Sequence, residues 1–472
     1  MTLAADVAAT LQPGFTGTQV PDWLVRASAE GLRSVCLYGE NVESPAGLAT
    51  LCHTLRDRMP GALLAVDEEG GDVTRLHYPA GSPSVGNAVL GRVDDTRRTR
   101  AVAAGIGREL RALGIGLDLA PDADVNSSPS NPVIGTRSFG DGPVRVARHT
   151  AAWVEGLQST GVAACAKHFP GHGDTVVDSH HGLPRVDAPV EVLWERELAP
   201  FRAAMSVGVA AVMTSHLVVS AIDPDRPATF SPATISLLRD ELGFDGLVVS
   251  DALDMAGASA ETGIPEAAVR ALLAGVDLLC LGSGTSPHTF DAVHAAIVAA
   301  VRTGRLPDQR VAEAAHRVRI LAASTAESLS RGARTREGDP SDATLPDEVV
   351  ARAFRVGDAA RRWLALPAPP VVIQVDSAAN LAVGGVRWGP AAVDATTPET
   401  DIPAGAKVAV VGRALDTAHP AHTLVDRLRA AGHEVVLVEC GWPRGGADLE
   451  TFGGSPAVAR VLVGLLRDGV GP

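Results

Sequence analysis

The sequence predicts an α/β protein in which a (β/α)8 TIM-type barrel is followed by a smaller α/β sandwich domain. Two observations lead to this prediction. Short apolar runs alternate with helical patterns from the amino terminus to about Ser324, and the later runs are apolar throughout. Continuous apolar runs are typical of parallel strands that are buried on both faces. Eight strand–helix repeats within roughly 330 residues indicate a barrel with long loops.

Seven of the expected strands are clear, and an eighth is expected in the first stretch of the chain. In order they are Ala9–Phe15, Ser34–Tyr38, Ala62–Val66, Gly116–Ala120, Ala163–Lys167, Ala210–Thr214, Gly246–Ser250 and Val276–Leu281. Helical patterns between them cover Arg97–Leu113, Val144–Gln158, Leu193–Val207, Ser231–Leu242 and Pro265–Ala274. A doubly wound open sheet is the alternative architecture, but no Gly-rich dinucleotide fingerprint follows an early strand.

Composition divides the chain into domains. Residues 326–346 are rich in Ser, Arg, Gly, Asp and Pro and predict a linker, so the predicted catalytic barrel is 1–325 and the small sandwich domain 347–472. In the second domain we expect helices at Asp347–Trp363, His422–Ala431 and Pro456–Leu466, and strands at Val371–Val375, Lys407–Val411 and Glu434–Glu439. This domain has no dense cluster of catalytic residue types, so we expect it to serve stability or dimer packing.

Charge and cysteine usage exclude several classes of function. The net charge of the 472 residues is −14, which argues against nucleic-acid and anionic-membrane partners. The five cysteines lack metal or redox spacing and are expected to be buried thiols. The first residues lack the basic and apolar regions of a signal peptide, and no apolar run has the length of a bilayer. We therefore expect a cytoplasmic protein.

Polar side chains follow five of the predicted strands, at the point where each strand ends. They are Asp67-Glu68-Glu69, Asp118 with Asp122, Lys167-His168, Ser215-His216 and Asp251. Barrel enzymes build their active sites at the C-terminal ends of the strands. One such residue would be explained as a loop group with its own partner, but five in succession predict that polar groups converge on one mouth.

The segment richest in titratable groups runs from Lys167 to Pro184 and carries four histidines and two aspartates. Metal binding is one interpretation, because His and Asp are good ligands. However, the spacing matches no recognised zinc pattern, and Lys167 would place a cation beside the metal. Proton transfer is the other interpretation. Asp178 precedes His180 by two residues, close enough in a bent loop to hydrogen-bond the imidazole and raise its pKa toward neutrality.

Asp251 and two arginines are the other candidates. Asp251 directly follows a buried strand, and this rigid placement suits a carboxylate nucleophile, although a helix N-cap is the structural alternative. Asp254 fits a structural role better. Arg75 and Arg137 lie on predicted mouth loops, where arginines make bidentate contacts with polar ligands. Taken singly, each arginine is also explained as a surface salt-bridge residue.

Together these segments resemble the β-N-acetylglucosaminidases of glycoside hydrolase family 3, above all the bacterial cell-wall-recycling type. The matching stretches are DEEGGDVTRL, APDADVNSSPSNPVIGTRSFG, KHFPGHGDTVVDSHHGLP, MTSH and GLVVSDALDM, within residues 67–255. The resemblance implies that Asp251 is the nucleophile and that His180, with Asp178 as its partner, is the acid/base. It also implies the groups that hold the terminal N-acetylglucosamine: Asp67, Arg75, Arg137, Lys167 and His168, with His216 as a supporting contact.

Two residues depart from the family pattern. Glu68 stands where the first motif usually has glutamine, and Asp72 stands where a basic residue is common. We expect these carboxylates to disfavour anionic groups on the substrate, which weakens the case for a muropeptide.

The sequence thus predicts a retaining exo-β-N-acetylglucosaminidase that acts by double displacement through a covalent glycosyl-enzyme on Asp251. The expected partner is a small carbohydrate with a terminal N-acetylglucosamine, with no cofactor and no metal, and the protein is expected to be a monomer or homodimer. Three alternatives stay open. Phosphorolysis could use the same site, because a neutral histidine base repels phosphate less than a carboxylate does. Metal-dependent hydrolysis could use the histidine cluster, and the third alternative is a non-catalytic sugar-binding protein.

Overall fold

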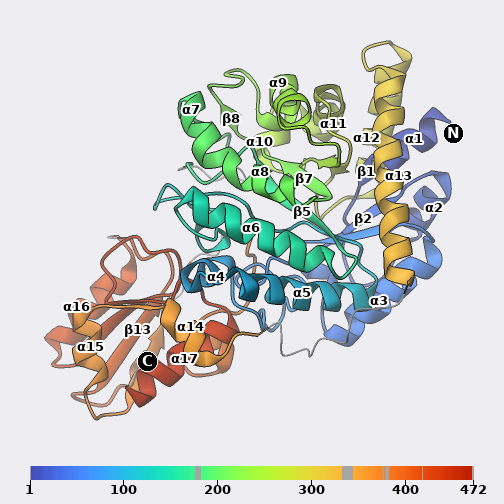
Figure 1. Cartoon of the computed structure of the whole chain (residues 1–472). Coiled ribbons are helices and arrows are strands. Elements are labelled where there is room, and N and C mark those ends of the chain that lie inside the picture. Colours follow the sequence, from blue (N-terminus) through green and yellow to red (C-terminus); the bar gives the residue numbers. More distant parts are fainter. Residues whose placement is uncertain are drawn as a thin grey trace.

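The first domain of the computed structural model is a barrel of parallel strands, and helices surround these strands in Figure 1. The structure describes residues 2–175, 182–331, 344–375, 377, 382–416 and 418–469. Within them, eight strands form the barrel wall: β1 (Leu11–Gln12), β2 (Ser34–Leu37), β3 (Leu63–Val66), β4 (Leu117–Asp118), β5 (Ala163–Phe169), β7 (Ala211–Thr214), β9 (Leu247–Val249) and β10 (Leu279–Cys280). The predicted (β/α)8 barrel is confirmed.

The ring closes through β1, which is the strand that the sequence marks least clearly. Six strands run side by side in the order β2-β3-β4-β5-β7-β9, and β1 pairs in parallel with β10. A parallel bridge between Val249 and Leu278 joins β9 to the start of β10. On the other side, the Cys36 amide donates to the Pro13 carbonyl at 3.0 Å, which joins β2 to the end of β1.

Helices cover the outside of the barrel and connect successive strands (Figure 1). They are α1 (Leu3–Ala9), α2 (Asp22–Glu30), α3 (Pro45–Arg58), α4 (Asn87–Val93), α5 (Thr96–Leu113), α6 (Pro143–Gln158), α7 (Val190–Val192), α8 (Leu198–Ser206), α9 (Pro232–Ser236), α10 (Ala256–Ser259), α11 (Gly263–Ala274), α12 (Pro287–Arg302) and α13 (Asp308–Ser330). Two short strands outside the wall, β6 (Arg185–Val186) and β8 (Val218–Val219), pair with each other. Since α13 continues to Ser330, the first residues of the segment predicted as a linker are helical.

Alternation along each strand separates two cores. In β3, Leu63 and Ala65 belong to the apolar cluster inside the barrel, whereas Leu64 and Val66 belong to the larger cluster between strands and helices. Successive side chains of a strand point to opposite faces, so a run that is apolar throughout fills both cores. All five cysteines are free and buried, as the sequence predicts.

The second domain is a five-stranded sheet with helices around it, shown in orange and red in Figure 1. Its strands, in spatial order, are β11 (Arg355–Val356), β15 (Leu449–Glu450), β14 (Glu434–Glu439), β13 (Lys407–Gly412) and β12 (Pro370–Gln374). Its helices are α14 (Asp347–Ala353), α15 (Asp358–Leu364), α16 (Pro420–Ala430) and α17 (Pro456–Asp468). The three predicted strands are present.

The predicted single helix over Asp347–Trp363 is wrong. It is two helices, α14 and α15, with β11 between them. β11 pairs antiparallel with β15, so the ladder of the sheet outweighs the local helical pattern there. Within the described residues, no helix combines the length and the apolar character needed to cross a membrane.

Candidate active site

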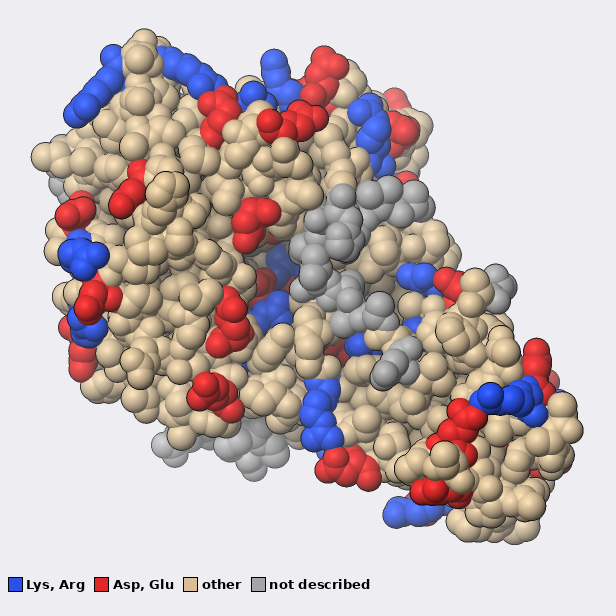
Figure 2. All heavy atoms as spheres, turned by 180° about the vertical axis from the view of Figure 1, so that it is seen from behind, with Lys and Arg blue, Asp and Glu red and all other residues tan. Residues whose placement is uncertain are grey.

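A cavity of about 580 Å³ opens at the C-terminal ends of the barrel strands. Its volume lies in the usual range of small-molecule sites. In Figure 2 the molecule is hollowed near the junction of the two domains, and basic and acidic side chains are visible inside the hollow. Six of the residues that the sequence singles out line the cavity: Asp67, Arg75, Arg137, Lys167, His168 and Asp251. Among the groups predicted at strand ends, Asp67, Glu69, Lys167, His168 and Asp251 converge on this cavity. The others do not line it: Glu68, Asp118, Asp122, Ser215 and His216.

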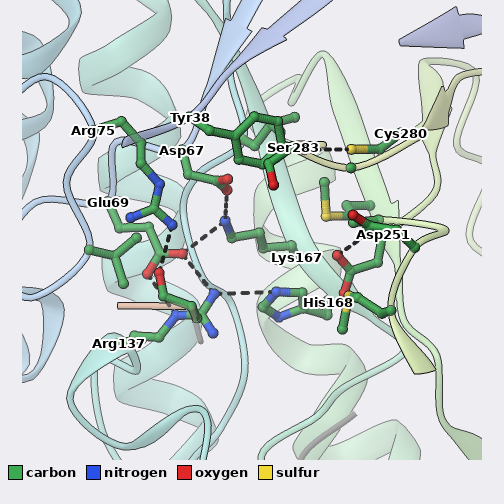
Figure 3. Close-up of a pocket in the computed structure, with 18 of the residues that line it drawn as sticks. Tyr38, Asp67, Glu69, Arg75, Arg137, Lys167, His168, Asp251, Cys280 and Ser283 are labelled. Atoms are coloured by element: carbon green, nitrogen blue, oxygen red, sulfur yellow. Dashed lines mark hydrogen bonds and ion pairs between the residues drawn. The ribbon is translucent and has the colours of Figure 1, made fainter. Parts of the chain in front are cut away.

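Four alternating charges build one wall of the cavity (Figure 3). The Lys167 ammonium lies 2.5 Å from Asp67 Oδ1 and 2.8 Å from Glu69 Oε1. Arg137 donates to both oxygens of Glu69, from Nη2 at 2.8 Å and from Nε at 3.0 Å. The bidentate geometry fixes the guanidinium plane. We call Asp67, Lys167, Glu69 and Arg137 the charge relay wall.

Because three of its four side chains are almost completely buried, the charges of this wall affect one another strongly. Lys167 and Glu69 are each 2% exposed at the side chain, and Arg137 is 5% exposed. Burial alone would raise the pKa of Glu69, but the charges of Arg137 and Lys167 hold that pKa below its ordinary value. Burial likewise opposes the charged form of Lys167, yet Asp67 and Glu69 raise its pKa. Two cations and two anions are therefore present together, and their charges balance.

His168 stands at the end of the wall, between Arg137 and a buried carboxylate. Its Nδ1 lies 2.7 Å from Asp124 Oδ2, and its Nε2 lies 3.3 Å from Arg137 Nη2. Because the Asp124 carboxylate accepts the Nδ1 hydrogen, Nε2 is left to accept from the arginine. Burial, with a smaller contribution from Asp124, raises the pKa of neighbouring Asp122 well above its ordinary value.

Asp122, Asp124 and His168 form the one group of side chains that could hold a metal ion in the part of the chain that is described. Ligand atoms of Asp122, Asp124 and His168 lie within 4.8 Å of one another. Two contacts oppose a cation there: Arg137 Nε is 3.6 Å from Asp122, and the Asp124 hydrogen bond uses His168 Nδ1. These contacts fit a hydrogen bond from His168 to Asp124 that orients the imidazole, and they do not fit a metal centre.

Asp251 lies across the cavity from the charge relay wall (Figure 3). It comes two residues after β9, and its Oδ1 accepts a hydrogen bond from the Ala252 amide at 2.8 Å. Ser250, directly before it, accepts from the Cys280 amide at 3.0 Å and so ties this turn to the next strand. The carboxylate is held by rigid backbone, as a group that must meet a reacting carbon requires.

Of the other three predicted site residues, the structure describes His216 alone. Asp178 and His180 fall outside the described residues. His216 is completely buried and is not among the residues that line the cavity. Its Nε2 donates to the Ala252 carbonyl at 3.0 Å, so it contacts the backbone beside Asp251.

Glu68 does not add charge to the cavity, and the expectation that it would is wrong. It is 1% exposed, and its Oε2 accepts from Thr74 Oγ1 and from the amides of Arg75 and Leu76 at 2.8 to 2.9 Å. The side chain turns inward because it closes the 68–76 loop. The same expectation for Asp72 is also wrong, because its carboxylate has partners of its own. It accepts hydrogen bonds from Thr136 Oγ1 at 2.7 Å and from the Gly454 amide of the second domain at 3.1 Å.

The second domain forms part of the cavity. Ala382 lines it, and the Ala382 carbonyl accepts a hydrogen bond from Arg75 Nη2 at 2.6 Å. Next to this contact, the Gly385 amide donates to Tyr78 Oη at 2.9 Å, and Val73 packs against Val383 and Val386. We call residues 382–386 the strap. The strap contacts Arg75 in space although the two are 307 positions apart in the sequence.

Replacing Tyr78 with phenylalanine tests whether the strap positions Arg75. The change removes one hydrogen bond to the strap, worth about 0.5–1.5 kcal/mol. We expect the KM for an aryl β-N-acetylglucosaminide to rise about two- to tenfold, with little change in kcat. The measurement is steady-state kinetics, with the exposed Arg460→Gln variant of the second domain as control. An unchanged KM in Tyr78→Phe would contradict the positioning role.

Glu197 supports the backbone that follows His168. Its Oε1 accepts from Arg196 Nε at 2.6 Å, whereas its buried Oε2 has no hydrogen-bond partner in the described residues. The Oε2 atom faces Gly171, where an added Cβ would come within 2.7 Å of it and where φ is +132°. Glycine is therefore required at this turn. Burial raises the pKa of Glu197 to about 7.

The Glu197→Gln variant should be more stable than the wild type at pH 8 but not at pH 5. A carboxyl whose pKa is raised on folding contributes stability that is present below about pH 4.5 and lost as pH rises through 7. We expect a difference of about 1–3 kcal/mol in the free energy of unfolding at pH 8. Chemical denaturation at both pH values measures it, with Glu155→Gln on α6 as control. A difference independent of pH would refute the raised pKa.

Sequence reasoning gave Glu69 no role of its own, and it missed Asp124, Tyr38, Cys280 and Ala382. Glu69 and Asp124 had a usable signal. Each lies two residues after a carboxylate at a strand end, and in extended backbone residues i and i+2 share a face. Tyr38 and Cys280 also lie where strands end, and Tyr38 Oη is 3.2 Å from Cys280 Sγ. Ala382 had no such signal, because a backbone carbonyl is offered by any residue.

Comparisons with known proteins agree with this arrangement. Residues 20–321 match the glycosyl hydrolase family 3 N-terminal domain. A solved glycoside hydrolase family 3 β-N-acetylglucosaminidase from Paenibacillus sp. FPU-7 superposes with a TM-score of 0.85 at 29% identity, covering 100% of this chain and 97% of that one.

Curated relatives point the same way. The chain is 34% identical to β-hexosaminidase A of Pseudoalteromonas piscicida over 348 residues, which cover 67% of this chain and 58% of that protein. It is 37% identical to the β-hexosaminidase LpqI of Mycobacterium tuberculosis over 265 residues, covering 55% of this chain and 67% of that protein. The resemblance drawn from the motifs is thus confirmed, and the chain belongs to glycosyl hydrolase family 3, among its β-N-acetylhexosaminidases.

Proposed function

We propose that this protein is a retaining exo-β-N-acetylglucosaminidase that releases terminal β-linked N-acetylglucosamine. The observation that carries the proposal is the pairing, in one cavity, of a rigidly held carboxylate, Asp251, with a wall of balanced charges on the opposite side. The cavity is of a size suited to a small molecule. The relatives of this chain are named β-hexosaminidases, and this supports an N-acetylhexosamine as the sugar that is released.

The charge relay wall, together with Arg75 beside it, is proposed to bind the hydroxyl groups of the terminal sugar. Asp67 accepts hydrogen bonds from hydroxyls, while Arg75, Arg137 and Lys167 donate to their oxygens. His168 Nε2 faces Arg137, and its Nδ1 is hydrogen-bonded to Asp124. These two contacts would orient the imidazole ring beside the sugar. Because cations and anions balance, an uncharged sugar matches this wall better than an ionised one.

The proposed reaction has two displacements. Asp251 attacks the anomeric carbon, while the leaving oxygen takes a proton, and a covalent glycosyl-enzyme results. Water then attacks the same carbon from the other side, Asp251 leaves, and the product keeps the β configuration. By the family resemblance, His180 gives the first proton and removes the second, with Asp178 as its partner. His216 is proposed to steady the backbone at Ala252 rather than to touch the sugar.

The test is turnover of p-nitrophenyl N-acetyl-β-glucosaminide and of chitobiose, with the product anomer followed by NMR. We expect β product from the wild type, and a smaller loss in His180→Ala on the aryl substrate than on chitobiose, because p-nitrophenolate leaves without help from an acid. Failure to release N-acetylglucosamine from either substrate would overturn the proposal. An α product would overturn the retaining mechanism, and a sugar 1-phosphate formed in phosphate buffer would identify phosphorolysis instead of hydrolysis.

A further inference from the structure

A second cavity, of about 230 Å³, lies between the barrel and the second domain, and shares no lining residue with the catalytic cavity. Three arginines line it: Arg92 from α4, Arg145 from α6 and Arg355 from β11. Trp442 and Phe452 of the second domain add aromatic surface, with their ring centroids 6.2 Å apart. We call this cavity the arginine cleft.

The arginines are incompletely neutralised. Arg355 pairs with Glu450, and Arg145 is 3.9 Å from Asp141, a long contact between exposed side chains. Arg92 donates its Nε to the Ala353 carbonyl at 2.8 Å, and no carboxylate pairs with it in the part of the chain that is described. Three cations thus face two anions, in a chain whose net charge is −14.

Further contacts indicate that the arginines are held together against repulsion. Burial and then the charges of Arg355 and Arg145 lower the pKa of Arg92. Arg145 Nε is buried and makes no hydrogen bond within the described residues. The guanidinium carbons of Arg92 and Arg355 lie 4.3 Å and 5.9 Å from the Phe452 ring centroid, so one ring supports both cations.

The backbone of Phe452 is unusual as well. Its φ is +59°, in the left-handed region that bulky residues rarely adopt. Such a conformation costs about 1–3 kcal/mol and persists where the surrounding structure requires it. Glycine would relieve the strain but would remove the ring beneath Arg92 and Arg355. The chain therefore maintains an aromatic ring at a strained position, directly against a surplus of positive charge.

We propose that the arginine cleft binds a small oxyanion, inorganic phosphate or the phosphate group of a sugar phosphate, between the barrel and the second domain. Guanidinium groups match phosphate oxygens through paired N–H donors. Arg92 and Arg145 belong to the barrel and Arg355 belongs to the second domain, so one bound phosphate would link the two domains. The aromatic surface suits the apolar face of a sugar ring, which gives a sugar phosphate an additional contact.

The cleft lies close to the sugar site along the chain. Phe139, Gly140 and Asp141 line the arginine cleft, whereas Arg137, two residues earlier, belongs to the catalytic wall. Asn87 at the start of α4 donates to the Arg137 carbonyl at 2.6 Å. The helix α4, which carries Arg92 of the cleft, therefore contacts the backbone of Arg137 in the catalytic wall.

Calorimetric titration of the full chain with inorganic phosphate and with glucose 6-phosphate tests the proposal. The titrations are run at constant ionic strength, with the catalytic cavity saturated by N-acetylglucosamine. We expect phosphate to bind at millimolar concentration or tighter, and to raise the unfolding midpoint by about 1–3 °C at ten times its Kd. Arg92→Gln and Arg355→Gln should each weaken binding at least tenfold. The control Arg467→Gln, an exposed arginine of the same domain, should bind within twofold of the wild type.

Each outcome decides the matter. Absence of phosphate binding to the wild type overturns the proposal, whether or not the variants fold. Equal binding by Arg92→Gln or Arg355→Gln and the wild type also overturns it, because the anion then lies elsewhere, including at Lys167 in the catalytic cavity. Loss of binding in both variants supports the site. Tighter binding of glucose 6-phosphate identifies a sugar phosphate as the better ligand, and equal affinities identify free phosphate.

Discussion

Replacing Asp251 with alanine is expected to lower kcat for p-nitrophenyl N-acetyl-β-glucosaminide by about four orders of magnitude or more. Losses of this size follow when a covalent nucleophile is removed, because no other group takes over bond formation to the anomeric carbon. The fold should persist, since the Asp251 side chain is partly exposed at the cavity and lies outside the apolar core. The measurement is steady-state kinetics, with circular dichroism as the check on folding.

Two further measurements separate a nucleophile from a structural residue. Azide added to Asp251→Ala should restore turnover and give the α-glycosyl azide, because the small anion attacks from the face that the carboxylate leaves. Asp254→Ala is the matched control: Asp254 also lines the cavity but lies three residues further on, and we expect less than a tenfold loss. Full activity in Asp251→Ala would refute the nucleophile assignment, and equal losses in both variants would point to a general effect on the loop.

The second large effect is expected from Glu69→Gln. Glu69 accepts two hydrogen bonds from Arg137 and lies 2.8 Å from Lys167, all of them nearly inaccessible to water. The amide that replaces the carboxylate leaves two buried cations facing one anion, Asp67, and its N–H donors oppose those of Arg137 or Lys167. Breaking a buried ion pair in this way costs about 3–5 kcal/mol.

We therefore expect Glu69→Gln to lose stability and activity together. Chemical denaturation at pH 7 measures the first loss, and kcat/KM measures the second. Glu109→Gln is the control, because its carboxylate is 41% exposed beside His77 and should contribute less than about 1 kcal/mol. If Glu69→Gln keeps wild-type stability, the charge relay wall is not the strongly coupled unit that the contacts indicate.

The barrel was predictable because its signal repeats. The strands are short, mostly apolar runs that alternate with helical patterns, and polar residues follow five of the predicted strands. The weakly marked first strand, expected in the Ala9–Phe15 stretch, completed the count of eight, and β1 closes the barrel between β10 and β2. The segment after the barrel repeats nothing, and there the helical pattern of 347–363 predicted one helix where β11 pairs with β15.

For the active site, residue type and position at a strand end were enough to find Asp67, Lys167, His168 and Asp251, and the loop motifs added Arg75 and Arg137. They were not enough to predict which of two adjacent side chains points into the cavity. Glu68 and Glu69 are adjacent carboxylates in one motif, yet Glu68 closes its own loop and Glu69 joins Lys167 to Arg137. The difference arises from the alternation of side chains and from the partners that each face meets.

The sequence by itself determined that this chain forms a barrel and that Asp67, Lys167, His168 and Asp251 lie at its mouth, because both follow from local periodicity and from the order of the strands. Only the tertiary structure decided that Glu69 balances Lys167 and Arg137, that Asp124 orients His168, and that Ala382 holds Arg75. These contacts join residues between 44 and 307 positions apart. Their existence depends on the directions of individual side chains and on how two domains pack, neither of which a local pattern encodes.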